Sequence, residues 1–199
     1  MINAKTVFVL APHADDAEFG CGGTIARLVE NGADVYSVVF AKADGRKDEM
    51  LTAGTLLGIK KCFLLELPIR NLGEHRQKIL DRLISLKEKL SPDLVIQPAL
   101  GDIHQDHQVV AQEGLRAFKD TNLWGYEEPW NNLNLSAQLF ISLADDHIEK
   151  KIKAIQCYKS QSHKPYADED YIRSLLKIQG VRVGVKGAEV FNIIRQVIK

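Results

Sequence analysis

Residues 6–41, TVFVLAPHADDAEFGCGGTIARLVENGADVYSVVFA, contain two apolar runs joined by a polar turn and a segment with helical periodicity. The runs at 6–11 and 34–41 are continuous and rich in β-branched side chains, which is typical of strands buried on both faces of a sheet. The segment 22–32 ends at Gly32, a residue that commonly terminates helices. This stretch therefore predicts a strand, a helix and a second, parallel strand.

The alternation of strands and helices continues along the chain. We expect further helices at about 46–57, 74–90 and 103–118, and further strands at 62–67 and 93–98. Such alternation indicates a mainly parallel sheet with helices on both faces. We therefore predict an α/β protein, a Rossmann-like three-layer sandwich.

The pattern is weaker after residue 118. Residues 122–132 have turn and aromatic content, 137–143 resemble a strand, and 145–161 resemble a helix. No internal repeat or linker-like tract marks a boundary, so we expect residues 1–199 to form a single domain.

Composition limits the classes of partner. Lysine plus arginine and aspartate plus glutamate both number 26 in 199 residues, so net charge recruits neither nucleic acid nor an acidic membrane. The three cysteines are far apart and form no CxxC pair, which argues against a disulfide framework and against a thiolate zinc site. We expect a cytoplasmic protein that acts on a small molecule.

Two polar clusters follow buried strands. His13, Asp15 and Asp16 come just after the strand at 6–11, and the sequence GDIHQDH, ending at His107, follows the strand at 93–98. Because the functional crevice of an open α/β sheet lies beyond the carboxyl ends of its strands, both clusters are expected at one edge.

The two clusters together contain the donor atoms of a metal site. His13, Asp16 and His107 offer two imidazoles and one carboxylate, a set that suits zinc with one position left open for catalysis. Asp15 is expected to point elsewhere and to accept a proton from a water molecule that the metal activates.

The second cluster also predicts a helix start. Asp102 and Gln105 form a plausible capping pair, which would start the helix near residue 103. We expect Asp106 to accept a hydrogen bond from His104 and to keep that histidine charged, so that it can stabilise an oxyanion.

The glycine-rich segment GCGG, residues 20–23, has two interpretations. It could form a phosphate-binding loop, but its spacing is not GxGxxG and no acidic residue closes the following strand. Close packing of a helix against a strand is the simpler interpretation.

The motifs PHADDAEFGCGGT and HQDH together resemble the PIG-L/LmbE-like family of zinc-dependent N-deacetylases, which act on acylated amino sugars and their conjugates. Three further segments, RKDEMLTAGTLLGI, YKSQ and GAEVF, are similar to other elements of that family. The resemblance covers nearly the whole chain.

The resemblance implies a role for each matching residue. His13, Asp16 and His107 match the ligands of one zinc ion per chain, and Asp15 matches the general base. His104, supported by Asp106, matches the electrophilic histidine and proton donor, and Arg46 matches a substrate-binding residue. Zinc and His104 would hold the tetrahedral oxyanion before a carboxylate and a free amine are released. Homo-oligomeric assembly is also implied.

The sequence departs from the family pattern at several positions. Ala14 replaces the usual proline, and the acidic residue that often follows the second aspartate stands at Glu18. Some relatives have a tyrosine at the position of Asp102, and Tyr126 is the substitute that we consider.

The expected function is therefore the removal of an N-acyl group, acetyl above all, from an amino sugar or a related small conjugate. A divalent-metal phosphohydrolase and a non-catalytic metal-binding module of the same fold are the alternatives. The phosphohydrolase would prefer oxygen ligands alone, and it has no evident use for His13 and His107.

Overall fold

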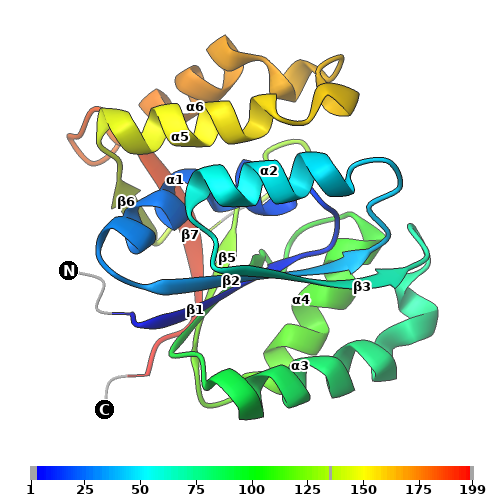
Figure 1. Cartoon of the computed structure of the whole chain (residues 1–199). Coiled ribbons are helices and arrows are strands. Elements are labelled where there is room, and N and C mark those ends of the chain that lie inside the picture. Colours follow the sequence, from blue (N-terminus) through cyan, green and yellow to red (C-terminus); the bar gives the residue numbers. More distant parts are fainter. Residues whose placement is uncertain (1–3, 135, 198–199) are drawn as a thin grey trace.

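The computed structural model describes residues 4–134 and 136–197. In these residues the strands form one sheet in the order β3-β2-β1-β4-β5-β7-β6 (Figure 1). The strands are β1 Thr6–Ala11, β2 Asp34–Ala41, β3 Lys61–Leu67, β4 Leu94–Pro98, β5 Asn122–Tyr126, β6 Leu139–Ser142 and β7 Ala188–Arg195. The helices are α1 Asp16–Glu30, α2 Lys47–Leu57, α3 Arg76–Leu90, α4 Gln105–Ala117, α5 Asp145–Gln156 and α6 Glu169–Val181. Short 3-10 helices lie at Leu72–His75, Lys159–Gln161 and Pro165–Ala167.

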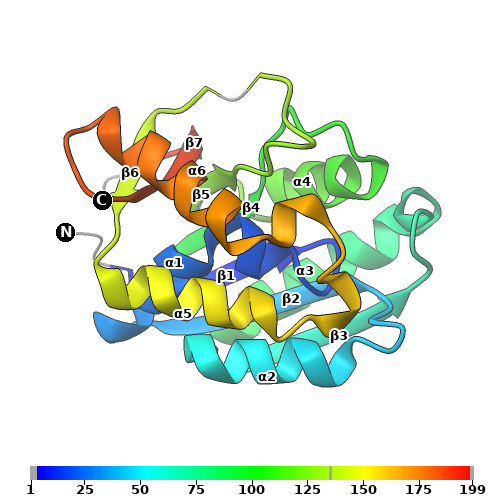
Figure 2. The ribbon, with the colours of Figure 1, turned by 90° about the horizontal axis from the view of Figure 1, so that it is seen from above.

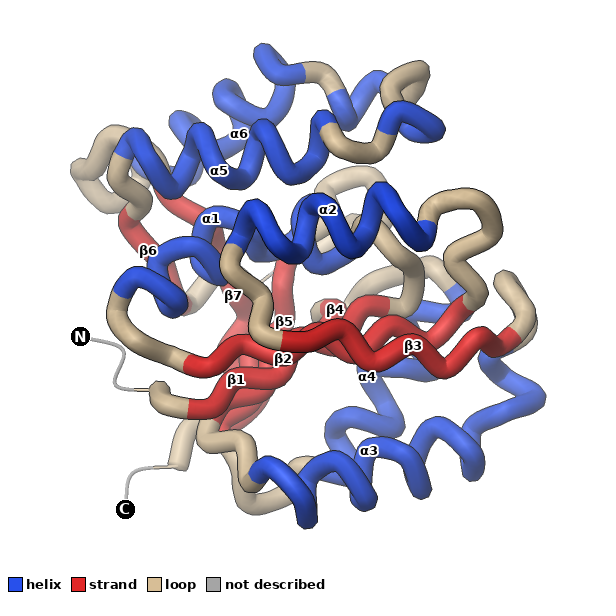
Figure 3. Tube along the Cα trace, viewed as in Figure 1, coloured by secondary structure: helices blue, strands red, loops and turns tan. Residues whose placement is uncertain are grey.

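The sheet is parallel from β3 to β5, and β7 runs antiparallel to both β5 and β6. Helices cover both faces, as Figure 3 shows, with α1, α2 and α5 on one side and α3 and α4 on the other. The view from above shows α6 crossing the end of the sheet that holds β6 and β7 (Figure 2). The predicted α/β sandwich with a mainly parallel sheet is confirmed.

The side chains of β1 explain why both faces are covered. Val7 and Val9 belong to the core beneath α1, α2 and α5, whereas Phe8 and Leu10 belong to the core that α3 and α4 complete. These four residues are fully buried. Because helices cover both faces of the sheet here, the strand is apolar at all four positions and does not alternate between apolar and polar residues.

Two predicted helix ends are correct. Gly32 lies just past the end of α1 with φ 84°, and Gly58 follows α2 with φ 80°. Both residues adopt the left-handed conformation that glycine adopts without a steric penalty.

Other boundaries differ from the prediction. α1 starts at Asp16 rather than at residue 22, and α5 ends at Gln156 rather than at 161. Residues 122–126 form β5 because they pair with β4, while α6 and β7 were not predicted at all. In the described part of the chain, no helix combines the length and apolarity that a bilayer crossing needs.

Candidate metal centre

Both polar clusters lie at the point where the strand order reverses. The chain runs from β1 to β2 and β3 on one side, and then returns to place β4 and β5 on the other side of β1. Since β1 and β4 are parallel neighbours, the turns that follow them emerge side by side at one edge. The two polar clusters therefore meet at one edge of the sheet, as expected.

Three donor atoms meet at this edge. The Nδ1 atom of His13 lies 3.2 Å from Oδ2 of Asp16 and 3.3 Å from Nε2 of His107. Nε2 of His107 is also 3.3 Å from the same Asp16 oxygen. A tetrahedral zinc ion with bonds of about 2.0–2.1 Å separates its ligand atoms by about 3.3 Å. The triangle of donors, two nitrogens and one oxygen, therefore fits zinc in both size and chemistry.

A carboxylate orients each of the two imidazoles from its far side. Nε2 of His13 lies 3.0 Å from Asp106, and Nδ1 of His107 lies 2.8 Å from Asp102. Such carboxylate–histidine pairs commonly orient the histidines of metal sites and raise their basicity. Asp102, which the sequence predicted as half of a helix cap, contacts His107 with one oxygen and accepts the backbone N–H of His104 with the other.

The pairing predicted for Asp106 is also different. Its carboxylate accepts hydrogen bonds from the backbone amides of Arg70 and Leu72 as well as contacting His13. Asp106 bonds to His104 through its backbone N–H and not through its carboxylate. The backbone around residue 70 turns toward α4 at this point, and this contact could not be predicted from the local sequence.

The electrostatics of the triangle favour a cation. Burial opposes protonation of both histidines, but the charge of Asp16 and the carboxylate hydrogen bonds raise the pKa of His13 to about 9 and that of His107 to about 11. Burial likewise opposes ionisation of Asp16, yet His107 and His13 hold its pKa well below the usual range. The three groups thus attract positive charge, as a metal site must.

His104 is the N-terminal cap of α4. Its Nδ1 atom accepts the backbone N–H of Asp106 at 3.1 Å. Burial, followed by the neighbouring His107 and His13, lowers the pKa of His104, so the ring favours the neutral form and not the expected cation. Because Nδ1 is an acceptor, the proton of the neutral ring is on Nε2. Its ring centre is 4.9 Å from that of His13, so this donor belongs to the same site.

Asp15 stands next to the triangle without joining it. One of its oxygens lies 3.1 Å from Nη1 of Arg46, which the turn after β2 places there. Burial and the charge of Asp16 raise the pKa of Asp15, and Arg46 opposes that rise. Arg46, predicted to bind substrate, therefore contacts the predicted base directly.

Two buried tyrosines, Tyr126 and Tyr158, bond to the backbone of β1 and of the turn that follows it. The hydroxyl of Tyr126 donates to the carbonyl of Leu10, and that of Tyr158 donates to the carbonyl of Ala14 at 2.5 Å. Both side chains are fully buried, so Tyr126 does not provide the carbonyl-polarising hydroxyl that we considered.

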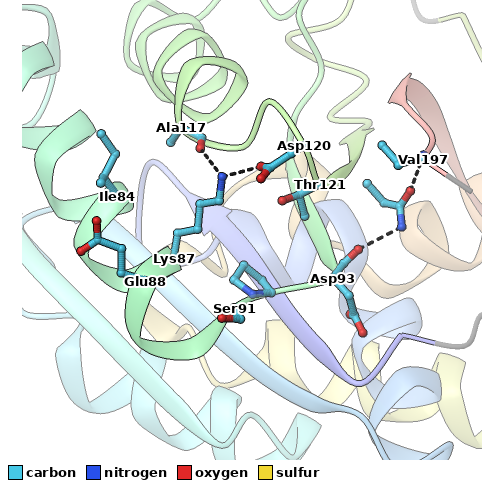
Figure 4. Close-up of a pocket in the computed structure, with 11 residues that line it drawn as sticks. Ile84, Lys87, Glu88, Ser91, Asp93, Ala117, Asp120, Thr121 and Val197 are labelled. Atoms are coloured by element: carbon cyan, nitrogen blue, oxygen red, sulfur yellow. Dashed lines mark hydrogen bonds and ion pairs between the residues drawn. The ribbon is translucent and has the colours of Figure 1, made fainter. Parts of the chain in front are cut away.

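The opposite edge of the sheet has a pocket of different character. It has a volume of about 670 Å³ and lies beside the amino ends of β4 and β5, near Asp93 and Asn122 (Figure 4). Lys87 crosses it toward Asp120 and the carbonyl of Ala117. None of the residues that line it belongs to the donor triangle.

Comparisons with known proteins identify the family of the chain. The sequence profile of the PIG-L family, described as GlcNAc-PI de-N-acetylase, matches residues 8–118, more than half of the chain. The chain belongs to the PIG-L family. It is thus a member of a family of hydrolytic N-deacetylases.

Individual relatives have related descriptions. The chain is 29% identical over 173 residues to a protein of Escherichia coli K12 described as the uncharacterized deacetylase YaiS, covering 78% of this chain and 91% of the relative. In an alignment 221 positions long, it is 24% identical to the diacetylchitobiose deacetylase of Thermococcus kodakarensis. This alignment covers 94% of this chain and 82% of the relative. The structure of the N,N'-diacetylchitobiose deacetylase of Pyrococcus horikoshii superimposes with a TM-score of 0.81 at 22% identity, covering 96% of this chain and 84% of that one.

The PIG-L match includes both polar clusters, but a buried acid beside His107 lies beyond it. Glu128 is 1% exposed, and its Oε2 atom is 3.9 Å from Nδ1 of His107. Burial, and then the charge of Asp16, raise its pKa well above the usual range. Sequence reasoning missed Glu128 because residues 122–132 were interpreted as a turn, and a single acid in a turn gives no signal of burial.

Proposed function

We propose that this PIG-L protein is a zinc-dependent hydrolase that removes an N-acyl group, principally acetyl, from an amino sugar or a related small conjugate. The observation that carries the proposal is the triangle of donor atoms from His13, Asp16 and His107, with Asp15 beside it. The descriptions of the two diacetylchitobiose deacetylases support the substrate class. We also propose that residues 1–199 act as one domain, since strands from both halves of the chain share one sheet.

We assign one zinc ion per chain to the triangle. When bound, zinc supplies a Lewis acid that polarises an acyl carbonyl and lowers the pKa of a water molecule. Asp102 and Asp106 hold the two imidazoles in orientation from the outside. Asp106 thus serves as a positioning residue in this proposal.

Asp15 accepts the proton as water adds to the amide carbon. The raised pKa makes Asp15 a stronger base than an exposed carboxylate, and Arg46 keeps it ionised. As the carbon–nitrogen bond breaks, the same proton passes from Asp15 to the leaving nitrogen, which gives a carboxylic acid and an amine. The acid then loses its remaining proton and the amine takes one up, so the products are a carboxylate and an ammonium ion, and atoms and charges balance.

His104 donates a hydrogen bond to the oxygen of the acyl group. The backbone of α4 occupies its Nδ1 atom, so the neutral ring presents an Nε2–H donor. A neutral donor stabilises negative charge on the oxygen without placing a second cation beside the metal. This assignment replaces the charged histidine that the sequence suggested.

Metal analysis and acetate release test the proposal. The purified protein should contain about one zinc per chain, lose activity on chelation and regain it with zinc, against N-acetylglucosamine and N,N'-diacetylchitobiose. Zinc without acetate release from any N-acetyl sugar would favour the non-catalytic module. Activity that depends on magnesium and releases phosphate would favour the phosphohydrolase.

A further inference from the structure

Helix α1 is broken in the middle of its glycine-rich segment. Cys21 has φ −151° and ψ 25°, so the helix divides into a short first segment, which begins at Asp16, and a longer second one. A break of this kind leaves carbonyl groups before it and amide groups after it without partners in the helix. These groups are buried and must be satisfied from elsewhere.

One buried ion pair satisfies both sides of the break. Lys151, from α5, donates to the carbonyl of Phe19 at 2.5 Å. Glu189, from β7, accepts the amides of Gly23 at 3.0 Å and of Thr24 at 2.6 Å. The two charged groups lie 2.6 Å apart, and their side chains are 4% and 3% exposed.

The glycines leave space for this pair. A Cβ atom on Gly22 would lie 3.1 Å from Cγ of Lys151, and one on Gly23 would collide with the side chain of Leu143 and lie 3.3 Å from Oε1 of Glu189. A Cβ atom on Gly20 would collide with the ring of Tyr126 on β5. Close packing is therefore the correct interpretation of GCGG, and part of what packs there is an ion pair.

The pair is connected to the proposed base through the backbone. Phe19 accepts from Lys151 with its carbonyl and donates its N–H to the carbonyl of Asp15 at 3.1 Å. Buried ion pairs add little net stability compared with apolar residues of the same size, because desolvation offsets the attraction. Directional bonds at a helix break have another consequence, since they set the angle between the two segments.

We propose that Lys151 and Glu189 are positioning residues that set the angle of the first segment of α1, and through it the placement of Asp15 and Asp16. Lys151 lies in α5 and Glu189 in β7, and neither element contains a residue of the donor triangle. The zinc and turnover measurements below rest on the proposed function, whereas the exchange measurement does not.

Two variants test the pair. Glu189→Asp keeps both charges but shortens the side chain, so it cannot reach Lys151 and both amides together. K151M/E189Q removes both charges at once and leaves no unpaired buried charge, which protects folding. The control is Lys186→Met, because Lys186 and Asp145 form an exposed ion pair that also joins α5 to the segment before β7.

We expect faster hydrogen exchange at residues 13–20 in the metal-free forms of both variants, with α3 and α4 unchanged. The zinc dissociation constant should rise about tenfold, which is the lower end of the loss of metal affinity seen when a residue that orients metal ligands is replaced. The kcat should fall while KM stays within about twofold. The control should match the wild type in all three measurements.

Folded variants with wild-type exchange at residues 13–20 would overturn the proposal. A uniform loss of protection over the whole chain would also overturn it, because it would show that the pair provides only stability. If the wild type bound no zinc or released no acetate, the proposed function would fail, and the exchange data would still decide the role of the pair.

Discussion

The Nε2 atom of His13 lies 3.0 Å from the carboxylate of Asp106, a residue 93 positions away in the sequence. Backbone amides of Arg70 and Leu72 hold the same carboxylate. We predict that Asp106→Asn weakens zinc binding by about 10- to 100-fold, since the amide orients the imidazole less firmly. Chelator competition measures the change. Asp81→Asn, at an exposed position on α3, is the control, and equal affinity in the two variants would contradict the prediction.

Replacing Asp15 by Asn separates metal binding from catalysis. Asp15 is not part of the donor triangle, so the variant should keep its zinc. The amide cannot accept the proton from water, so kcat should fall by at least about 100-fold. Zinc content and acetate release are measured on the same preparation. Undiminished turnover would rule out Asp15 as the base.

His104 combines two functions that different substitutions can separate. Asn is a good helix cap, so His104→Asn should keep the stability of α4 while losing the Nε2–H donor and most of kcat. His104→Ala should lose the donor and, in addition, about 1 kcal/mol of stability from the missing cap. Thermal unfolding and kcat give the two readouts. If His104→Asn retained full activity, the donor role would be wrong.

Arg46 should control the acid side of the pH profile. Burial and Asp16 already raise the pKa of Asp15, and Arg46 lowers it. Without Arg46 that pKa rises further, so Asp15 is protonated at higher pH and loses its function as a base. Arg46→Met should therefore move the acid limb of kcat/KM to higher pH, whereas Arg46→Lys should restore part of the difference. An unmoved limb would mean that Arg46 acts on substrate alone.

Zinc affinity should increase with pH. The pKa of His13 is raised to about 9 and that of His107 to about 11, so at pH 7 both rings carry a proton that zinc must displace. Affinity should therefore rise from pH 6.5 through pH 9, where His13 loses its proton. The proton on His13 stabilises the metal-free fold below the unfolded pKa of about 6.5, and this stabilisation disappears as pH passes 9. Calorimetry in buffers of different ionisation enthalpy counts the released protons, and none at pH 7 would refute the assignment.

The sequence alone determined the parallel core of the fold and the location of the site. Apolar runs such as residues 6–11 and helix stops such as Gly32 are local signals, because burial on both faces and a left-handed turn each restrict residue type directly. The two histidine clusters follow strands that become parallel neighbours, so the edge where they meet could also be predicted.

Only the tertiary structure decided how those residues are paired. Asp106 contacts His13, and Asp102 contacts His107. Lys151 and Glu189 bond to the backbone on the two sides of the break in α1. Glu128 is buried because β5 pairs with β4 and brings the following loop beside His107. Most of these contacts join segments that are far apart in the sequence. Residue type and spacing within one segment therefore cannot predict them.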